Sequence, residues 1–184
     1  MTRMIIVAAP SGAGKSSFVE RISSEISKLH DVVTYTTRAP RVGESQGHPY
    51  FFIERADFER KIEEGFFVEW AQVHTNYYGT SYRQLEAAWA EGKVAIMDID
   101  IQGVATFKNK FPDAKTIFIL PPSIDELRRR VLARPGGAPP DLEVRMKNAE
   151  KEILESPRFD YRVVNDEFNS SYAIFKKIVE ELIS

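Results

Sequence analysis

Short apolar runs alternate with amphipathic stretches along most of this chain. Four runs are four to seven residues long and rich in apolar side chains, which is typical of buried strands: residues 4–8, 94–100, 116–120 and 161–164. After the first run, Phe18, Ile22, Ile26 and Leu29 recur at helical spacing, which predicts an amphipathic helix. Strands that alternate with helices indicate an α/β fold, with a central parallel sheet flanked by helices.

Residues 32–80 interrupt this alternation, because they are rich in aromatic residues and in strand-like runs. We expect strands at 32–36, 49–53 and 66–70, a short helix ending at Gly65, and a turn at 76–79. This content is too β-rich for a simple crossover between parallel strands, so a small mixed insertion is predicted. Later helices are expected after the caps Ser81 and Ser123 and at residues 141–155 and 172–183.

The loop between the first strand and the first helix carries the clearest chemical signal. It consists of Ala9, Pro10, Ser11, Gly12, Ala13, Gly14, Lys15, Ser16 and Ser17. Glycines allow a tight turn whose N–H groups converge on a phosphate, while Lys15 reaches the β- and γ-phosphates and the Ser16 hydroxyl ligates Mg²⁺. Ala9 departs from the usual pattern, which begins with glycine. We interpret the loop as a P-loop; the alternative is a glycine-rich turn with a chance Lys-Ser pair.

Several charged residues further along the chain allow two interpretations each. Arg38 and Arg41 lie in an irregular loop, where they either clamp a phosphate or are solvated charges. Asp98 ends an apolar strand, so it either holds Mg²⁺ or caps the following helix. Glu69 is flanked by apolar residues, so it lies on the wet face of an edge strand or serves a specific purpose.

Composition narrows the class of protein. The chain has 184 residues, 43% of them hydrophobic and 28% charged, which is ordinary for one soluble globular domain. A net charge of −2 gives no general attraction to nucleic acid or to a membrane surface. There are no cysteines, which suits a reducing compartment, and neither a signal peptide nor a bilayer-spanning run is apparent. We therefore expect a cytoplasmic protein.

The middle of the chain resembles the guanylate kinase family, bacterial members of which often begin the loop with alanine. The resemblance rests on Thr36-Thr37-Arg38-x-Pro40-Arg41-x-Gly43-Glu44-x-x-Gly47-x-x-Tyr50, Glu69-Trp70-Ala71, Asn76-Tyr77-Tyr78-Gly79-Thr80 and Asp98-Ile99-Asp100-x-Gln102-Gly103. Together with the P-loop and Val164-Asn165-Asp166, these motifs extend the resemblance over nearly the whole chain.

The resemblance implies a single guanylate kinase-like domain over residues 1–184. Its parts would be a P-loop core (1–31, 81–123 and 156–184), a GMP-binding insertion (32–80) and an arginine-bearing lid (124–155). The implied reaction transfers the γ-phosphoryl group of ATP to GMP, giving ADP and GDP, in purine nucleotide metabolism and GMP recycling. The cofactor would be Mg²⁺ with ATP as co-substrate, and dGMP is an expected further acceptor. We expect a monomer or homodimer with no nucleic-acid or membrane partner.

The resemblance also implies a role for individual residues. The expected catalytic residues are Lys15, Arg38, Arg130, Arg134 and Arg145. ATP would be bound by the nine loop residues above and by Asn165. The expected GMP-binding residues are Thr34, Arg38, Arg41, Tyr50, Glu69, Tyr78, Thr80, Asp98 and Asp100. The Mg²⁺ ligands would be Ser16 and Asp98.

The chemistry of guanine agrees with this reading. Guanine presents two donors where adenine presents a lone pair, so a carboxylate such as Glu69 favours guanine and repels adenine. Two alternatives stay open: a related module that binds a protein partner without catalysis, and a kinase with a sugar-phosphate acceptor. Lys15, Ser16 and Asp98 argue against the first, and Glu69 with Thr34 argues against the second, since a sugar has no base edge to read.

Overall fold

The core of the protein is a parallel sheet, seen in a computed structural model that describes residues 3–73, 75–133 and 139–184. Its strands lie in the order β10-β9-β1-β8-β2, and every adjacent pair is parallel. Their bounds are β1 Met4–Ala8, β2 Leu29–Asp31, β8 Val94–Asp98, β9 Lys115–Leu120 and β10 Tyr161–Val164. The expected α/β fold class and the four predicted core strands are confirmed.

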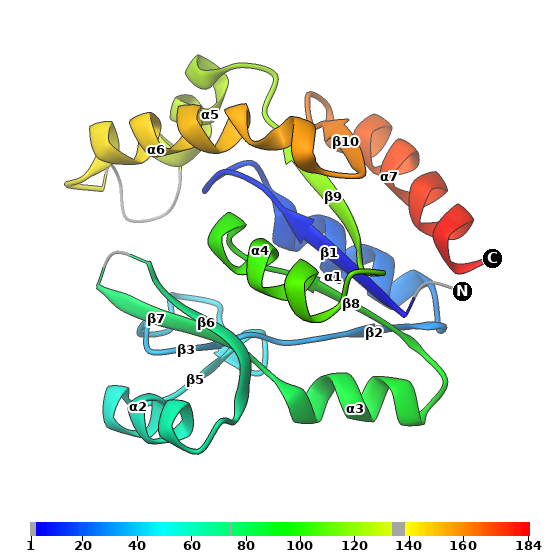
Figure 1. Ribbon diagram of the computed structural model, residues 1–184. Coiled ribbons are helices and arrows are strands. Elements are labelled where there is room, and N and C mark those ends of the chain that lie inside the picture. The colour runs from blue at the N-terminus through cyan, green and yellow to red at the C-terminus, as the bar shows by residue number, and fades with distance from the viewer. Residues whose placement is uncertain (1–2, 74, 134–138) are drawn as a thin grey trace.

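Helices cover both faces of this sheet (Figure 1). On one face lie α1 Lys15–Glu25, α5 Ile124–Leu132, α6 Leu142–Leu154 and α7 Phe168–Ile183. On the other lie α3 Tyr82–Ala90 and α4 Ile101–Lys110. Both predicted serine caps are present, since Ser81 accepts from Gln84 N–H and Ser123 from Glu126 N–H. A short 3₁₀ helix, Ser156–Arg158, precedes β10.

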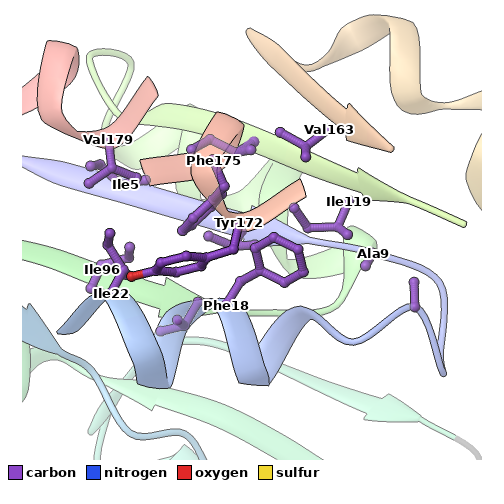
Figure 2. Packing of buried hydrophobic residues seen from close by; sticks show 14 of the residues in the cluster. Ile5, Ala9, Phe18, Ile22, Ile96, Ile119, Val163, Tyr172, Phe175 and Val179 are labelled. Carbon is purple, nitrogen blue, oxygen red and sulfur yellow. The ribbon is translucent and has the colours of Figure 1, made fainter. Parts of the chain in front are cut away.

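The two helical layers explain why β1 is apolar throughout. Ile5 and Val7 belong to the hydrophobic core beneath α1 and α7, whereas Met4, Ile6 and Ala8 belong to the core beneath α3 and α4. Both faces of the strand are therefore dry, as expected for a central parallel strand. Figure 2 shows the first of these cores, in which the ring of Phe18 on α1 lies next to Tyr172 and Phe175 of α7.

A second, mixed sheet lies at one side of the core (Figure 1). Its strand order is β4-β5-β3-β7-β6, with bounds β3 Tyr35–Thr36, β4 Ser45–Gln46, β5 Pro49–Phe52, β6 Phe67–Val73 and β7 Asn76–Ser81. Helix α2, Arg55–Glu63, packs on it through Phe58, whose ring stacks on Phe67 with 4.4 Å between the ring centroids. The strands of this sheet run from residue 35 to residue 81, one residue past the mixed segment predicted at 32–80.

Three local predictions were wrong. Of the strand expected at 32–36, only Tyr35–Thr36 forms one, as β3 of the second sheet; β2 of the core sheet already ends at Asp31. The intervening backbone bonds to a side chain, since Val33 N–H donates to Oε1 of Gln84 at 2.9 Å. Leu29 belongs to β2 and not to the first helix, which ends at Glu25.

The turn expected at 76–79 belongs instead to β7. Its residues form an antiparallel ladder with β6 that continues to the pair Val73 and Asn76. Asn and Gly favoured a turn in the sequence, but cross-strand pairing determines the structure here. Among the described residues, no helix is long and apolar enough to cross a membrane.

Candidate active site

The glycine-rich loop has the backbone geometry that its sequence predicts. Gly12 and Gly14 adopt φ angles of 108° and 93°, a region in which other residues are strained. Ala13 N–H donates to the carbonyl of Pro10 at 3.0 Å, and Gly14 is the N-cap of α1. The loop therefore turns directly in front of a helix N-terminus, where free N–H groups and the helix dipole favour an anion.

Lys15 and Ser16 both face Asp98. The Ser16 hydroxyl donates to Oδ2 of Asp98 at 2.7 Å, and Lys15 Nζ lies 3.9 Å from the same oxygen. Burial alone would lower the pKa of Lys15, but attraction to Asp98 and other nearby groups leaves that pKa above its ordinary value. Helix capping falls to Asp100, which accepts from Gln102 N–H at 3.0 Å. Asp98 is thus free of the capping role considered above.

The donor set of Ser16 and Asp98 fits Mg²⁺. A hydroxyl and a carboxylate supply hard oxygen ligands, and Mg²⁺ commonly binds proteins through one or two such groups while keeping waters and phosphate oxygens. The oxygens of Ser16 and Asp98 are already within hydrogen-bonding distance of each other. These two side chains would therefore hold the ion next to the loop.

A cavity of about 590 Å³ opens beside the loop, and the core sheet, the second sheet and α6 all contribute to its walls. The predicted site residues that line it are Ala9, Ser11, Gly12, Lys15, Ser16, Thr34, Arg38, Arg41, Tyr50, Glu69, Tyr78, Asp98, Asp100 and Arg145. A smaller hollow of about 160 Å³ is lined by Pro10, Gly12, Gly14, Lys15, Ser16 and Ser17. Since Gly12, Lys15 and Ser16 line both spaces, the loop lies between them.

Glu69 is a buried carboxylate at this cavity, with only 7% of its surface exposed. Thr80 lies opposite it on β7, and the Thr80 hydroxyl donates to Oε1 of Glu69 at 3.0 Å. Burial raises the pKa of Glu69 to about 7, with a contribution from Asp100, although the Thr80 hydrogen bond opposes the rise. A buried carboxylate that lines a cavity is suited to accept hydrogen bonds from a ligand.

Thr34 supplies a second unused polar group at the cavity. Its side chain is 6% exposed, and no hydrogen-bond partner for its Oγ1 is present in the part of the chain that the structure describes. A buried hydroxyl without a partner is costly, so a ligand atom that bonds to it would be favoured.

Arg38 is held in place by Glu44 through two contacts of 2.9 Å, one to each carboxylate oxygen. Glu44 also accepts from Arg41 N–H at 2.8 Å. Burial alone would raise the pKa of Glu44, but these bonds hold it below its usual range. The guanidinium also lies 5.4 Å from the ring centroid of Tyr50. Arg38 is therefore oriented before any ligand arrives.

Burial, with repulsion from Asp98, raises the pKa of Tyr50 to about 12, which keeps its hydroxyl protonated.

Helix α6 presents a polar stripe to the cavity, formed by Arg145, Asn148 and Glu152 with Asp141 at its start. Arg145 donates to Oδ1 of Asp141 at 2.8 Å. Burial raises the pKa of Glu152 to about 7, and repulsion from Asp100 adds to the rise. Positions 141, 145, 148 and 152 follow helical spacing, which places them on one face of the helix. The sequence predicted a site role for Arg145 alone among them.

The remaining predicted residues lie elsewhere. Arg130 does not line the cavity; it donates to the carbonyls of Asn165 and Asp166 at 2.9 and 3.0 Å. Asn165 is buried and its amide donates to the carbonyl of Ala13 at 2.8 Å, so it supports the glycine-rich loop. Thr80 contacts Glu69 without lining the cavity. Arg134 lies outside the described residues.

Sequence reasoning missed three residues at this site. Glu44 orients Arg38, Glu152 lines the same cavity as Lys15, and Gly103 lies against the Glu69 carboxylate. Glu44 and Gly103 stood inside quoted motifs. Gly103 meets a carboxylate from a distant segment, and Glu44 meets Arg38 only because of the shape of their irregular loop, so the sequence alone did not indicate either contact.

Comparison with known proteins gives a consistent result over the whole chain. The sequence model of the guanylate kinase family matches residues 1–182. A guanylate kinase of Bdellovibrio bacteriovorus is 71% identical over 183 residues, which are 100% of this chain and 99% of that protein. The crystal structure of guanylate kinase from Anaplasma phagocytophilum is 30% identical, with a TM-score of 0.80 over 98% of this chain and 85% of the other.

A second structural match has lower sequence identity and bears on the fold alone. The shikimate kinase from Bacteroides thetaiotaomicron has 17% identity and a TM-score of 0.51, covering 96% of this chain and 98% of the other. That likeness shows a shared kinase fold alone. The family match, in contrast, rests on both sequence and structure. The chain therefore belongs to the guanylate kinase family and is a nucleoside monophosphate kinase.

Proposed function

We propose that this protein transfers the γ-phosphoryl group of ATP to GMP, releasing ADP and GDP. The observation that carries the proposal is the shared cavity, which contains the lysine of the phosphate-binding loop together with the buried carboxylate of Glu69. One cavity that suits both phosphates and a base with two donors is what this reaction requires.

ATP is proposed to bind with its phosphates on residues 9–17. The N–H groups at Gly12–Gly14 and the α1 N-terminus face the β- and γ-phosphates, and Lys15 neutralises part of their charge. Ser16 and Asp98 are the proposed Mg²⁺ residues, and the ion supplies further charge neutralisation when bound. Asn165, which holds the loop carbonyl of Ala13, keeps the loop in this shape.

GMP is proposed to bind with its base at the second sheet. Glu69 accepts from guanine N1–H and N2–H₂, while the unpartnered Thr34 hydroxyl donates to O6. Asp100 lies nearby, and Thr80 supports Glu69. The GMP phosphate is held by the preoriented Arg38, with Arg41, Tyr50 and Tyr78 around it.

Phosphoryl transfer itself needs alignment and charge neutralisation more than covalent chemistry. Lys15, Arg38 and Arg145 line the cavity and are the proposed catalytic residues. Arg130 is bound to backbone carbonyls beside β10 and would reach the phosphates only after α5 moves; Arg134 is proposed to act with it. No general base is required, because the acceptor phosphate is already ionised.

We extend the proposal to the organisation of the chain. Residues 1–31, 81–123 and 156–184 would act as the core, residues 32–80 as the GMP-binding part and residues 124–155 as a lid that excludes water on closing. We further propose use of dGMP, a role in purine nucleotide metabolism, a monomeric or homodimeric state and a cytoplasmic location, the last because a cysteine-free chain suits a reducing compartment.

The test is a coupled assay of ADP release with ATP, Mg²⁺ and each of GMP, dGMP, AMP, CMP and UMP. We expect ADP release with the two guanine nucleotides and its loss when EDTA removes Mg²⁺. Equal rates with AMP would contradict the assignment of the base site. An absence of release with every nucleotide, from a folded sample, would contradict the proposed reaction.

A further inference from the structure

Gly103 occupies the third position of α4, where its backbone does not need a glycine. Helix α4 is regular after its N-cap Asp100, and Gly103 is not among the glycines with positive φ. Glycine is the poorest helix former after proline, so an alanine would favour this helix. A reason for the missing side chain must therefore lie outside α4.

The obstacle to a side chain here is the carboxylate of Glu69. A Cβ at position 103 would lie 2.8 Å from Oε2 and 3.2 Å from Cδ of Glu69, both shorter than ordinary contacts. The next neighbour, Cδ1 of Ile99, would be at 3.6 Å, which is an ordinary van der Waals distance. Helix α4 packs directly against β6, the strand that carries Glu69 (Figure 1).

Glu69 is restrained on its other side as well. Oε1 accepts the Thr80 hydrogen bond at 3.0 Å, and the strand register is irregular between Phe67 and Glu69. The side chain is 7% exposed, so it has little room to choose another rotamer. The carboxylate is thus fixed between a hydroxyl on β7 and a bare helix backbone on α4.

We propose that Gly103 is a positioning residue for acceptor specificity, because its missing Cβ lets the Glu69 carboxylate lie against α4 in the orientation that reads the base. The inference rests on the proposed function, in which Glu69 accepts the guanine donors. The Gly103→Ala substitution would displace the carboxylate, so the selectivity for the acceptor base should fall.

The experiment compares Gly103→Ala with wild type, using Asn109→Ala as the matched control, since Asn109 is an exposed residue of the same helix. For Gly103→Ala we expect the KM for GMP to rise about tenfold or more, as for a misaligned hydrogen bond to a charged group, while kcat at saturating GMP changes less. The preference for GMP over AMP should fall. Asn109→Ala should leave all three values unchanged.

A second substitution separates positioning from a general packing role. The Glu69→Asp substitution shortens the side chain by one methylene, which removes the clash with a Cβ at position 103. On this background, Gly103→Ala should therefore raise the KM for GMP by less than twofold. If Gly103→Ala alone fails to fold, the double variant should fold. Failure of both to fold would show that the glycine serves another neighbour and would overturn the inference.

The outcomes distinguish a failure of this inference from a failure of the proposed function on which it rests. If wild type does not phosphorylate GMP, or if Glu69→Gln keeps the full preference for GMP over AMP, the proposed function fails. If both of those tests succeed but Gly103→Ala keeps the wild-type KM and preference, only the inference about Gly103 fails. A fall in kcat and melting temperature without a change in preference would likewise overturn it, because that pattern is expected of a purely structural glycine.

Discussion

The hydroxyl of Ser16 donates a 2.7 Å hydrogen bond to the carboxylate of Asp98, although the two residues lie 82 positions apart. The contact follows from topology, because β1 and β8 are adjacent parallel strands and their carboxyl ends meet at the same edge of the sheet. Lys15 shares this carboxylate at 3.9 Å. A cation, a hydroxyl and a carboxylate are therefore in place before nucleotide binds.

Lys15→Ala is expected to abolish phosphoryl transfer and to leave the fold intact. The side chain pairs with Asp98 at 3.9 Å, and Asp98 keeps its hydrogen bond from Ser16 when the lysine is lost, so the protein should remain folded. Turnover, in contrast, needs its charge on the transferred phosphoryl group. ADP release and thermal unfolding measure the two effects, with Lys93→Ala, a surface lysine paired with Glu91, as control. Loss of folded structure in Lys15→Ala would contradict this view.

Glu69→Gln is expected to reduce the preference for GMP over AMP by about 100-fold or more. The amide keeps one acceptor but adds a donor, which opposes a guanine donor and suits the adenine lone pair. Because the two side chains have nearly the same shape, packing against Gly103 should be retained. The measurement is kcat/KM for each nucleotide, and an unchanged ratio would rule out Glu69 as the reader of the base.

The pH dependence of GMP use should report the same carboxylate. Burial raises the pKa of Glu69 to about 7, and only the ionised form accepts both guanine donors. We therefore expect kcat/KM for GMP to fall as the pH drops through 7, approaching about tenfold per pH unit in more acidic solution. The substrate phosphate also titrates near pH 6, so the Glu69→Gln variant serves as the reference. Parallel profiles for the two proteins would refute the assignment.

Arg145→Ala is expected to lower kcat by about 10³-fold with a smaller change in the KM for GMP. Arg145 lines the cavity in which we propose that the phosphates react, and Asp141 holds its guanidinium there. Arg128 is a matched control, because it joins the neighbouring helix α5 to Glu143 of α6 and does not line the cavity. A larger loss of activity from Arg128→Ala than from Arg145→Ala would reverse the proposed roles.

What could be predicted from the sequence is mainly what depends on local contacts. The glycine-rich loop was foreseen because the positive φ of Gly12 and Gly14 and the adjoining lysine are encoded within a few residues. The apolar core strands were foreseen because a strand buried on both faces reads as a continuous apolar run.

The interior of the site was harder to predict from the sequence, because it depends on contacts between distant segments. Glu69, Thr80 and Gly103 come from two strands and a helix, and neither their spacing nor their type indicates that they meet. The segment around Thr34 looked like one strand, since apolar and β-branched residues suit either sheet; the crossing between sheets is stabilised by Gln84, which is 51 positions away from Val33. Arg130 was predicted to act from the lid, yet its guanidinium donates a hydrogen bond to the backbone carbonyl of Asn165, directly after β10.

A last prediction concerns the pH dependence of stability. Asp31 ends β2, and burial, with repulsion from Asp98 and Glu20, raises its pKa from the ordinary 3.8 to about 6, although His48 opposes the rise. Between those two pH values the folded protein keeps a proton that the unfolded chain has released. Stability is therefore lost as the pH rises from 3.8 to 6, and the full cost of the buried charge is present above 6.

Asp31→Asn removes that cost, so it should raise the free energy of unfolding by about 1–3 kcal/mol at pH 8 and by almost nothing near pH 3.5. Urea unfolding at the two pH values measures the difference, and m-values should match wild type because the substitution changes no buried area. Asp113→Asn, at an exposed position, controls for the general loss of one negative charge and should show no such gain. An equal effect of Asp31→Asn at both pH values would mean that the amide acts through packing or hydrogen bonding, and that Asp31 is not a destabilising buried charge.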